Sequence, residues 1–76
     1  MEKGDLVYIP SNTPLRQYDD SGVFITKEIQ LDKPTVGIFK RRDNEHFLPE
    51  QSEIWLGETG GQYWWVSEQN IYKQNA

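Results

Sequence analysis

The segment from Ile54 to Val66 constrains the fold of this chain more than any other. It holds all three tryptophans of the 76-residue sequence, placed on both sides of a Gly60-Gly61 pair. Short runs of β-branched, aromatic and aliphatic residues flank a glycine turn, which is typical of two strands joined as a β-hairpin. We therefore expect strands over residues 53–57 and 62–66.

Three further segments have the composition of strands. Residues 6–9 are β-branched and aromatic and stop at Pro10, residues 23–31 follow period 2, and residues 35–40 are again β-branched and aromatic. No part of the chain shows helical periodicity. These patterns predict an all-β fold, a five-stranded small barrel that forms one domain over residues 1–76.

The residues between these strands predict turns and one short helix. Asp19 to Gly22 is a turn, residues 41–52 form a polar loop, and Gly37 inside its strand suggests a bulge or a sharp coil. Residues 67–72 predict one turn of 3-10 helix, in which Ser67 could cap the start and Ile71 could return to the core.

A domain of this size has a small core and usually needs a staple or dense packing. The chain has no cysteine for a disulfide and a single histidine, so neither a disulfide nor a structural zinc site is predicted. The remaining means is packing. We expect the ten aromatic residues, three Trp, four Tyr and three Phe, to supply much of it.

Catalytic motifs are not evident in the sequence. The only histidine, His46, falls in the predicted loop, and pairs of carboxylates such as Asp19/Asp20 and Glu50/Glu53 occur without any predicted pocket. The glycines lack the spacing of a phosphate-binding loop. We therefore expect no enzymatic activity, no cofactor and no metal site.

The net charge of −4 and the pI of about 4.8 argue against nucleic acid as the partner. The only basic cluster, residues 40–42, is followed by Asp43 and Glu45; this favours a solvated hairpin tip, with an anion contact as the alternative. The N-terminal residues are polar and no apolar run approaches the ~20 residues of a membrane span. We expect a cytoplasmic protein without a membrane contact.

The aromatic residues suggest a surface for a protein partner. Five residues are expected to face inward, and period 2 then places Trp64 inside and Tyr63 and Trp65 on the opposite face. The five are Val36, Ile38, Ile54, Leu56 and Val66. Trp55, Tyr8 and Phe39 are expected near the outward rings across neighbouring strands.

Two interpretations of these rings stay open. The rings could complete a small core beneath the long loops, or they could form an exposed aromatic patch, which marks protein interfaces. On the second interpretation the candidate partner-binding residues are Tyr8, Trp55, Tyr63 and Trp65.

The two ends and the middle of the chain resemble the SH3-like small β-barrels. Residues 3–10 resemble the first strand of that group, residues 33–38 fit its middle, and residues 65–72 resemble its last strand, one-turn 3-10 helix and closing segment. More narrowly, the chain resembles short uncharacterised proteins of tailed bacteriophages, cyanophages included. The resemblance implies the barrel fold and a viral origin, and it implies no activity.

The sequence also departs from the peptide-binding SH3 domains. Trp64-Trp65 abuts the closing motif instead of starting the third strand, Ser67 replaces the usual proline, and Pro10 ends the first strand early. These departures argue against polyproline recognition. Asp19 and Asp20 could mimic the acidic loop of those domains, although two carboxylates beside Ser-Gly are more often a solvated turn.

These observations lead to one functional hypothesis and two alternatives. The chain is expected to be a non-catalytic protein–protein interaction module, a small phage accessory protein that docks on a host or viral protein in the host cytoplasm. The acidic surface would suit a partner with basic character. The alternatives are a minor virion component or homo-oligomer, and a protein that binds single-stranded nucleic acid.

Overall fold

The computed structural model describes residues 1–43 and 50–74, and in these ranges the protein is all-β. The elements in chain order are β1 (Leu6–Ile9), β2 (Pro14–Tyr18), β3 (Ile25–Gln30), β4 (Thr35–Asp43), β5 (Gln51–Leu56), η1 (Gly57–Thr59), β6 (Gln62–Ser67), η2 (Glu68–Asn70) and β7 (Tyr72–Lys73). Both η elements are single turns of 3-10 helix. No helix in the described ranges is long and apolar enough to cross a membrane.

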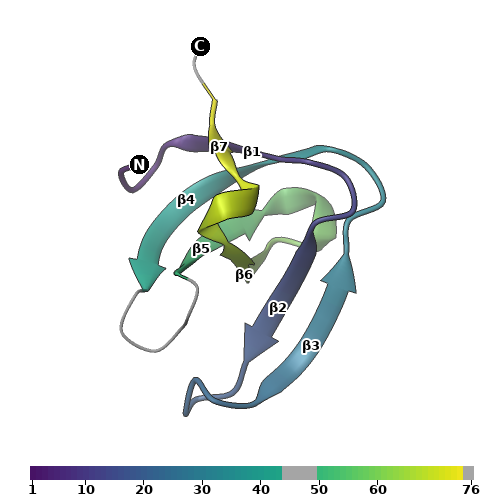
Figure 1. Cartoon of the computed structure of the whole chain (residues 1–76), viewed down its shortest axis with the longest axis vertical. Coiled ribbons are helices and arrows are strands. Elements are labelled where there is room, and N and C mark those ends of the chain that lie inside the picture. Colours follow the sequence, from purple (N-terminus) through teal and green to yellow (C-terminus); the bar gives the residue numbers. More distant parts are fainter. Residues whose placement is uncertain (44–49, 75–76) are drawn as a thin grey trace.

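The strands form one antiparallel sheet in the order β3-β2-β6-β5-β4-β1-β7 (Figure 1). Strands β4, β5 and β6 follow one another as a meander, β1 pairs with β4, and β7 pairs with β1. The β2–β3 hairpin joins the other edge of the meander, where Arg16 pairs with Trp65. β3 is the last strand of the sheet on this side and forms its outer edge, and the hairpin projects from the rest of the molecule (Figure 1).

The described residues contain seven strands, two more than the sequence predicts. The extra strands are β2 and β7. In β2 only Leu15 is fully buried, so no alternation of buried and exposed residues marks the strand in the sequence. β7 is two residues long and is a strand only because it pairs with Val7 and Tyr8 of β1.

The core is mainly aliphatic, contrary to the expectation that aromatic residues supply much of the packing. Eight of the ten buried residues that form one cluster in the described ranges are aliphatic. The ten are Val7, Ile9, Leu15, Leu31, Phe39, Ile54, Leu56, Trp64, Val66 and Ile71. Phe39 and Trp64 are its two aromatic members, and Trp64 is its largest side chain that is fully buried. The other described rings therefore remain available to the surface.

The predicted orientation of β5 and β6 is confirmed, whereas that of β4 is wrong. Ile54, Leu56, Trp64 and Val66 are buried as expected. Val36 and Ile38 instead face outward, with 44% and 40% of their surface exposed. Phe39, expected outside, is buried.

The register with β1 explains why β4 faces this way. Val7 and Ile9 are fully buried, and their partners across the sheet are Gly37 and Thr35. Residues directly opposite each other in an antiparallel sheet point to the same face, so residues 35, 37 and 39 must point inward. Gly37 has the smallest side chain of the strand, and for that reason the inward face does not appear apolar in the sequence.

The irregularity predicted at Gly37 lies three residues further along the strand. The β4–β5 register shifts between Phe39 and Arg41, so that Phe39 opposes Ile54 and Arg41 opposes Glu53. Lys40 is the extra residue of this bulge, and bulges re-aim the side chains beside them. As a result Lys40 and Arg41 both reach Glu53 on the outer face of the sheet.

The predicted Gly60-Gly61 turn and the 3-10 turn of the closing segment are confirmed. The loop predicted over residues 41–52 is wrong at both ends, since β4 extends to Asp43 and β5 begins at Gln51, and a 3-10 turn that the sequence does not predict, η1, follows β5. Gly60 and Gly61 both have positive φ angles, 85° and 69°, in the connection between β5 and β6. The predicted 3-10 turn is η2, and Ile71 after it is buried in the core. Ser67 is the N-cap residue, but its hydroxyl makes no capping hydrogen bond.

Candidate functional site

Four apolar side chains form a row across the outer face of the sheet. Leu6 of β1 pairs with Ile38 of β4, Ile38 pairs with Trp55 of β5, and Trp55 pairs with Tyr63 of β6. Directly opposed side chains on one face are neighbours, with Cβ atoms about 5 Å apart. Leu6, Ile38 and Tyr63 are exposed and Trp55 is half-buried, so the row is a continuous apolar surface in contact with solvent.

One end of this row is hollowed into a pocket of about 220 Å³. We call it the lysine-rimmed pocket, and its lining residues are Lys3, Gly4, Ile38, Phe39, Lys40, Trp55 and Tyr63. The N-terminal turn is held against the pocket, because the backbone N–H of Gly4 donates to the carbonyl of Phe39 at 2.9 Å. The pocket therefore combines an apolar floor with two cationic side chains at its rim.

Glycines in the β5–β6 connection leave room for the Trp55 indole. A Cβ atom on Gly57 would lie 3.1 Å from Cη2 of Trp55, and one on Gly61 would lie 3.6 Å from its Cζ2. The ring thus rests against the backbone of the turn on one side while Tyr63 stands opposite it across the strands. This arrangement restricts the indole to a position where it can form a wall of the pocket.

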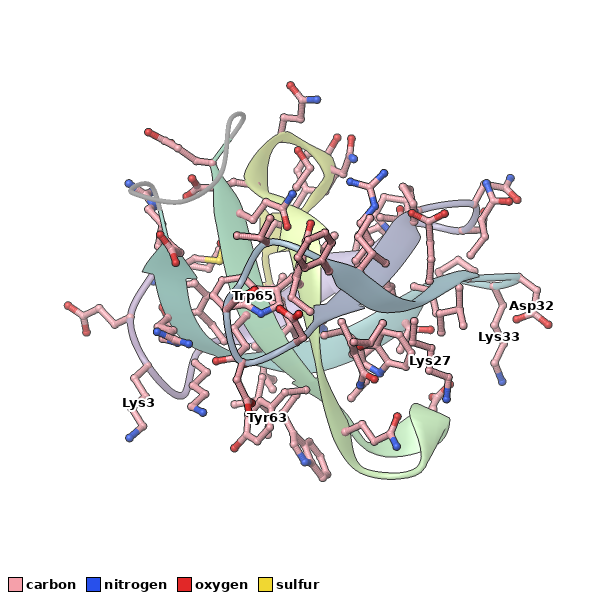
Figure 2. The ribbon with its side chains drawn as sticks, turned by 90° about the horizontal axis from the view of Figure 1, so that it is seen from below. Lys3, Lys27, Asp32, Lys33, Tyr63 and Trp65 are labelled. Carbon is pink, nitrogen blue, oxygen red and sulfur yellow. The ribbon has the colours of Figure 1, made fainter. Side chains whose placement is uncertain are left out.

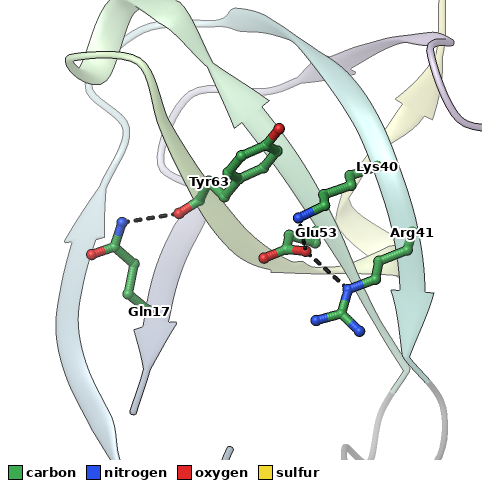
Figure 3. A network of polar contacts seen from close by, with 5 residues as sticks. All are labelled: Gln17, Lys40, Arg41, Glu53 and Tyr63. Atoms are coloured by element: carbon green, nitrogen blue, oxygen red, sulfur yellow. Dashed lines mark hydrogen bonds and ion pairs between the residues drawn. The ribbon is translucent and has the colours of Figure 1, made fainter. Parts of the chain in front are cut away.

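Tyr63 is fixed at both its backbone and its ring (Figure 3). The side-chain amide of Gln17 donates to the Tyr63 carbonyl at 2.9 Å, which links β2 to β6. Lys40 Nζ lies 4.2 Å from the centre of the Tyr63 ring, a cation–π contact, and 3.5 Å from Oε1 of Glu53. Arg41 Nε donates to the same Oε1 at 2.9 Å, so Glu53 holds two cations in place.

A second pocket, of about 390 Å³, lies on the other side of Glu53. We call it the acidic pocket, and its lining residues are Tyr18, Asp19, Asp20, Ser21, Gly22, Arg41, Asp43, Glu53 and Trp65. The turn between β2 and β3 supplies the residues 19–22, and the ends of β4 and β5 supply the rest of the polar wall. Four carboxylates and one guanidinium therefore line this pocket together with the half-buried Trp65 ring.

Hydrogen bonds within the β2–β3 turn stabilise the charged form of Asp19. The Ser21 hydroxyl donates to Asp19 Oδ1 at 2.5 Å, and the Ser21 backbone N–H donates to the same oxygen at 3.1 Å. The hydroxyl bond is the largest cause that holds the pKa of Asp19 below its ordinary value. The rim of the acidic pocket thus keeps this negative charge in mildly acidic solution.

Arg41 occupies part of the acidic pocket. Its guanidinium carbon lies 5.1 Å from the centre of the Trp65 ring. The Trp65 ring therefore already accepts one cation–π contact from its own chain.

The structure divides the four predicted partner-binding residues among three places. Trp55 and Tyr63 share the lysine-rimmed pocket, and Trp65 belongs to the acidic pocket. Tyr8 lines neither pocket; it is 38% exposed and its ring centre lies 6.4 Å from that of Tyr72 on β7. All four are at least partly exposed, so none of them serves only to fill the core.

Several residues of these pockets are not predicted from the sequence. Lys3, Lys40 and Glu53 carry the charge that separates the two pockets, and each has an ordinary sequence context. The position of Lys40 depends on the bulge in β4, and no turn residue marks that bulge. The visible signal is Asp19-Asp20, two adjacent carboxylates in a predicted turn.

The predicted basic hairpin tip is instead part of β4. Lys40 and Arg41 pair with Glu53, and Arg42 pairs with Glu68 of η2. His46 lies outside the described residues. Within the described residues no group of three or more His, Cys, Asp or Glu side chains is arranged to hold a metal ion.

Comparisons with protein-family models, with curated proteins and with solved structures found no match for this chain.

Proposed function

We propose that this chain is a non-catalytic protein-interaction module that binds a basic segment of its partner on the outer face of β5 and β6. The acidic pocket carries the proposal, because it places the Trp65 ring among four carboxylates. An aromatic face attracts a cation, and carboxylates close to it add charge attraction. An arginine or lysine side chain of the partner suits both groups.

The surroundings of the pocket agree with a recognition role. The net charge of −4 attracts a basic segment at long range and raises its rate of association. Tryptophan is also among the residues that contribute most to protein interfaces. The expected partner is a host or viral protein.

The second part of the proposal concerns the fold. We propose that β7, β1, β4, β5 and β6, which are consecutive in the sheet, form a five-stranded SH3-like barrel, with the β2–β3 hairpin as an insertion after the first strand. The 3-10 turn directly before the last strand supports this interpretation. The resemblance to tailed-phage proteins adds the proposal that the protein is a small phage accessory protein.

A peptide titration tests the function. The probe is an acetylated and amidated nonapeptide with three arginines among serines and glycines, followed through the intrinsic tryptophan fluorescence of the protein. We expect saturable binding that weakens as salt is raised. A peptide with glutamate in place of arginine should not bind in the same way.

Two substitutions locate the binding site. Asp20 is exposed and belongs to the acidic pocket, whereas Asp32 is also exposed but lies at one end of the molecule, away from Trp65 (Figure 2). Asp20→Asn should weaken the arginine peptide by about two- to fivefold, from ~0.5–1 kcal/mol for an exposed charge contact. Asp32→Asn, with the same change of charge, should alter affinity much less. Equal effects of the two, or equal binding of both peptides, would contradict the proposal.

A second candidate function is self-association, as in a minor virion component or a homo-oligomer. β3 ends the sheet, and beside it Val23, Phe24 and Ile25 are 68%, 69% and 51% exposed. An exposed edge strand next to apolar residues is a template for pairing with another chain. Sedimentation over micromolar to millimolar concentration tests this candidate, and Phe24→Ser should reduce any dimer that forms.

Binding of single-stranded nucleic acid has less support. The three cations of the basic cluster, residues 40–42, are paired with carboxylates of the same chain. Such pairing leaves little charge for phosphate contacts, which dominate that affinity. A titration with oligonucleotides at low salt tests this alternative.

A further inference from the structure

We infer that the lysine-rimmed pocket binds a large apolar side chain flanked by carboxylates, on an acidic segment of the partner protein. This inference rests on the proposed function in one respect, that the β5–β6 face binds protein. It concerns a different pocket and the opposite charge.

The apolar half of the expected ligand follows from the walls of the pocket. Ile38, Trp55 and Tyr63 stand in register across three strands and form most of its surface. The volume of about 220 Å³ is that of a site for one large side chain rather than for an extended chain. Pockets with aromatic walls are typical sites for an anchoring residue of a partner.

The charged half of the expected ligand follows from the rim. Among the described residues, Lys3 and Lys40 are the only charged side chains that line the pocket. Lys3 is exposed and forms no ion pair with any other described residue. Lys40 is held over the Tyr63 ring and shares Glu53 with Arg41, so its ammonium group is already positioned beside the pocket.

The local charge decides the sign of the ligand even though the whole chain is acidic. At physiological ionic strength charges are screened over about 8 Å, so a group inside the pocket responds mainly to the charges at its rim. These include Glu53 beside Lys40, but Glu53 shares its single charge between Lys40 and Arg41, and Lys3 has no ion-pair partner among the described residues, so the rim stays net positive. Asp5, which directly follows Gly4 of the pocket, accepts a hydrogen bond from the Glu2 backbone N–H at 2.8 Å and lies 3.7 Å from Nζ of Lys73. Its charge is therefore compensated outside the pocket.

The two pockets are close enough for one bound segment. Tyr63 and Trp65 are two residues apart on the same face of β6, a distance of about 7 Å along a strand. A basic residue in the acidic pocket and an acidic, apolar anchor in the lysine-rimmed pocket can thus belong to neighbouring positions of one extended chain. Such a pattern of charge would also fix the direction in which the segment lies.

The test compares three acetylated and amidated pentapeptides by NMR titration of the protein at 0.15 M salt. The probe is Gly-Glu-Phe-Glu-Gly, the first control replaces both glutamates with glutamine, and the second replaces phenylalanine with serine. We expect the probe to bind at least threefold tighter than either control, with the largest shifts at Trp55 and Tyr63. Equal affinity for the probe and the glutamine peptide would overturn the inference.

Variants separate the rim lysines from lysines in general. Lys3→Gln combined with Lys40→Gln should weaken the probe at least threefold, because both rim charges are removed. The matched control is Lys27→Gln combined with Lys33→Gln, which removes the same charge from two exposed lysines that line neither pocket; Lys33 lies at the end of the molecule opposite Lys3 (Figure 2). A loss in this control as large as that in the rim variant would contradict the inference.

The outcomes also separate this inference from the proposed function. If the arginine peptide binds at Trp65 and the acidic probe does not bind, this inference fails alone. If the acidic probe binds at Trp55 and the arginine peptide does not bind, the assignment of the acidic pocket fails and this inference stands.

Discussion

Replacing Gly37 with alanine is the sharpest test of the packing that positions both pockets. The added Cβ would lie 2.4 Å from Cγ2 of Ile54, 2.5 Å from Cδ2 of Leu56 and 2.9 Å from the carbonyl oxygen of Trp55. Carbon atoms in ordinary contact are about 3.5–4.0 Å apart, so each of these atoms would have to move by half an ångström or more. The carbonyl belongs to the backbone of β5 and cannot rotate away.

The expected loss of stability can be estimated from this geometry. One extra methyl group in a well-packed core costs about 1–3 kcal/mol. The 76 residues suggest a total free energy of unfolding of about 4–11 kcal/mol, from ~0.05–0.15 kcal/mol per residue. For a domain of this size 1 kcal/mol changes the melting temperature by about 4–8 °C, so Gly37→Ala should lower it by at least about 4 °C.

Thermal unfolding followed by circular dichroism and urea unfolding followed by tryptophan fluorescence both measure this change. The control is Val36→Ala, since Val36 is the neighbouring residue and faces solvent. The control should cost less than about 1 kcal/mol. A Gly37→Ala protein as stable as the wild type would refute the assignment of residue 37 to the inner face, and with it the register that brings Ile38 next to Trp55.

Three further predictions follow from the structure. The hydroxyl of Ser52 is fully buried and has no hydrogen-bond partner among the described residues. In urea unfolding, Ser52→Ala should therefore leave the free energy of unfolding unchanged or raise it by up to ~1 kcal/mol. A decrease of more than ~1 kcal/mol would show that the hydroxyl does form a hydrogen bond. Ile71 is buried after η2, so Ile71→Ala should cost ~2–5 kcal/mol, and a cost below ~1 kcal/mol in the same assay would show that the closing segment is not part of the core. The pKa values of Asp5 and Asp19 are lowered, chiefly by hydrogen bonds from Glu2 and Ser21 respectively. Both carboxylates therefore stabilise the fold at pH values above their unfolded pKa of about 3.9. This stabilisation is lost as the pH falls through the lower pKa values of the folded state. Urea unfolding from pH 7 to pH 2.5 should show a smaller loss in the double variant Asp5→Asn, Asp19→Asn than in the wild type, and identical profiles would contradict it.

The sequence predicts much of the fold because local chemistry decides it. The Gly60-Gly61 turn, the alternation around Trp64 and the buried Ile71 each depend on residues close in the chain, and each is confirmed. The predicted inward face of β4 is shifted by one residue, because the true inward positions include Thr35 and Gly37, which are not apolar enough to mark that face in the sequence. Only the pairing with Val7 and Ile9, about thirty residues earlier, determines which face is buried.

The candidate site is predicted less completely for the same reason. Trp55, Tyr63 and Trp65 are correctly placed on the outer face, because period 2 along β5 and β6 is a local property. That they fall into two pockets of opposite charge depends on the bulge at Lys40 and on the β2–β3 turn, which reaches across to Trp65. These are long-range contacts, and no motif of the sequence encodes them by itself.

The most direct measurement of the two-pocket account uses the three indole N–H signals in an NMR titration. A single peptide carrying an arginine and, next to it along the chain, a Glu-Phe-Glu segment should occupy both pockets. We expect the indole N–H signals of Trp55 and Trp65 to shift with the same dissociation constant, and the indole N–H signal of the buried Trp64 to stay in place. Shifts confined to other residues, or no saturable shift at either exposed indole, would contradict it.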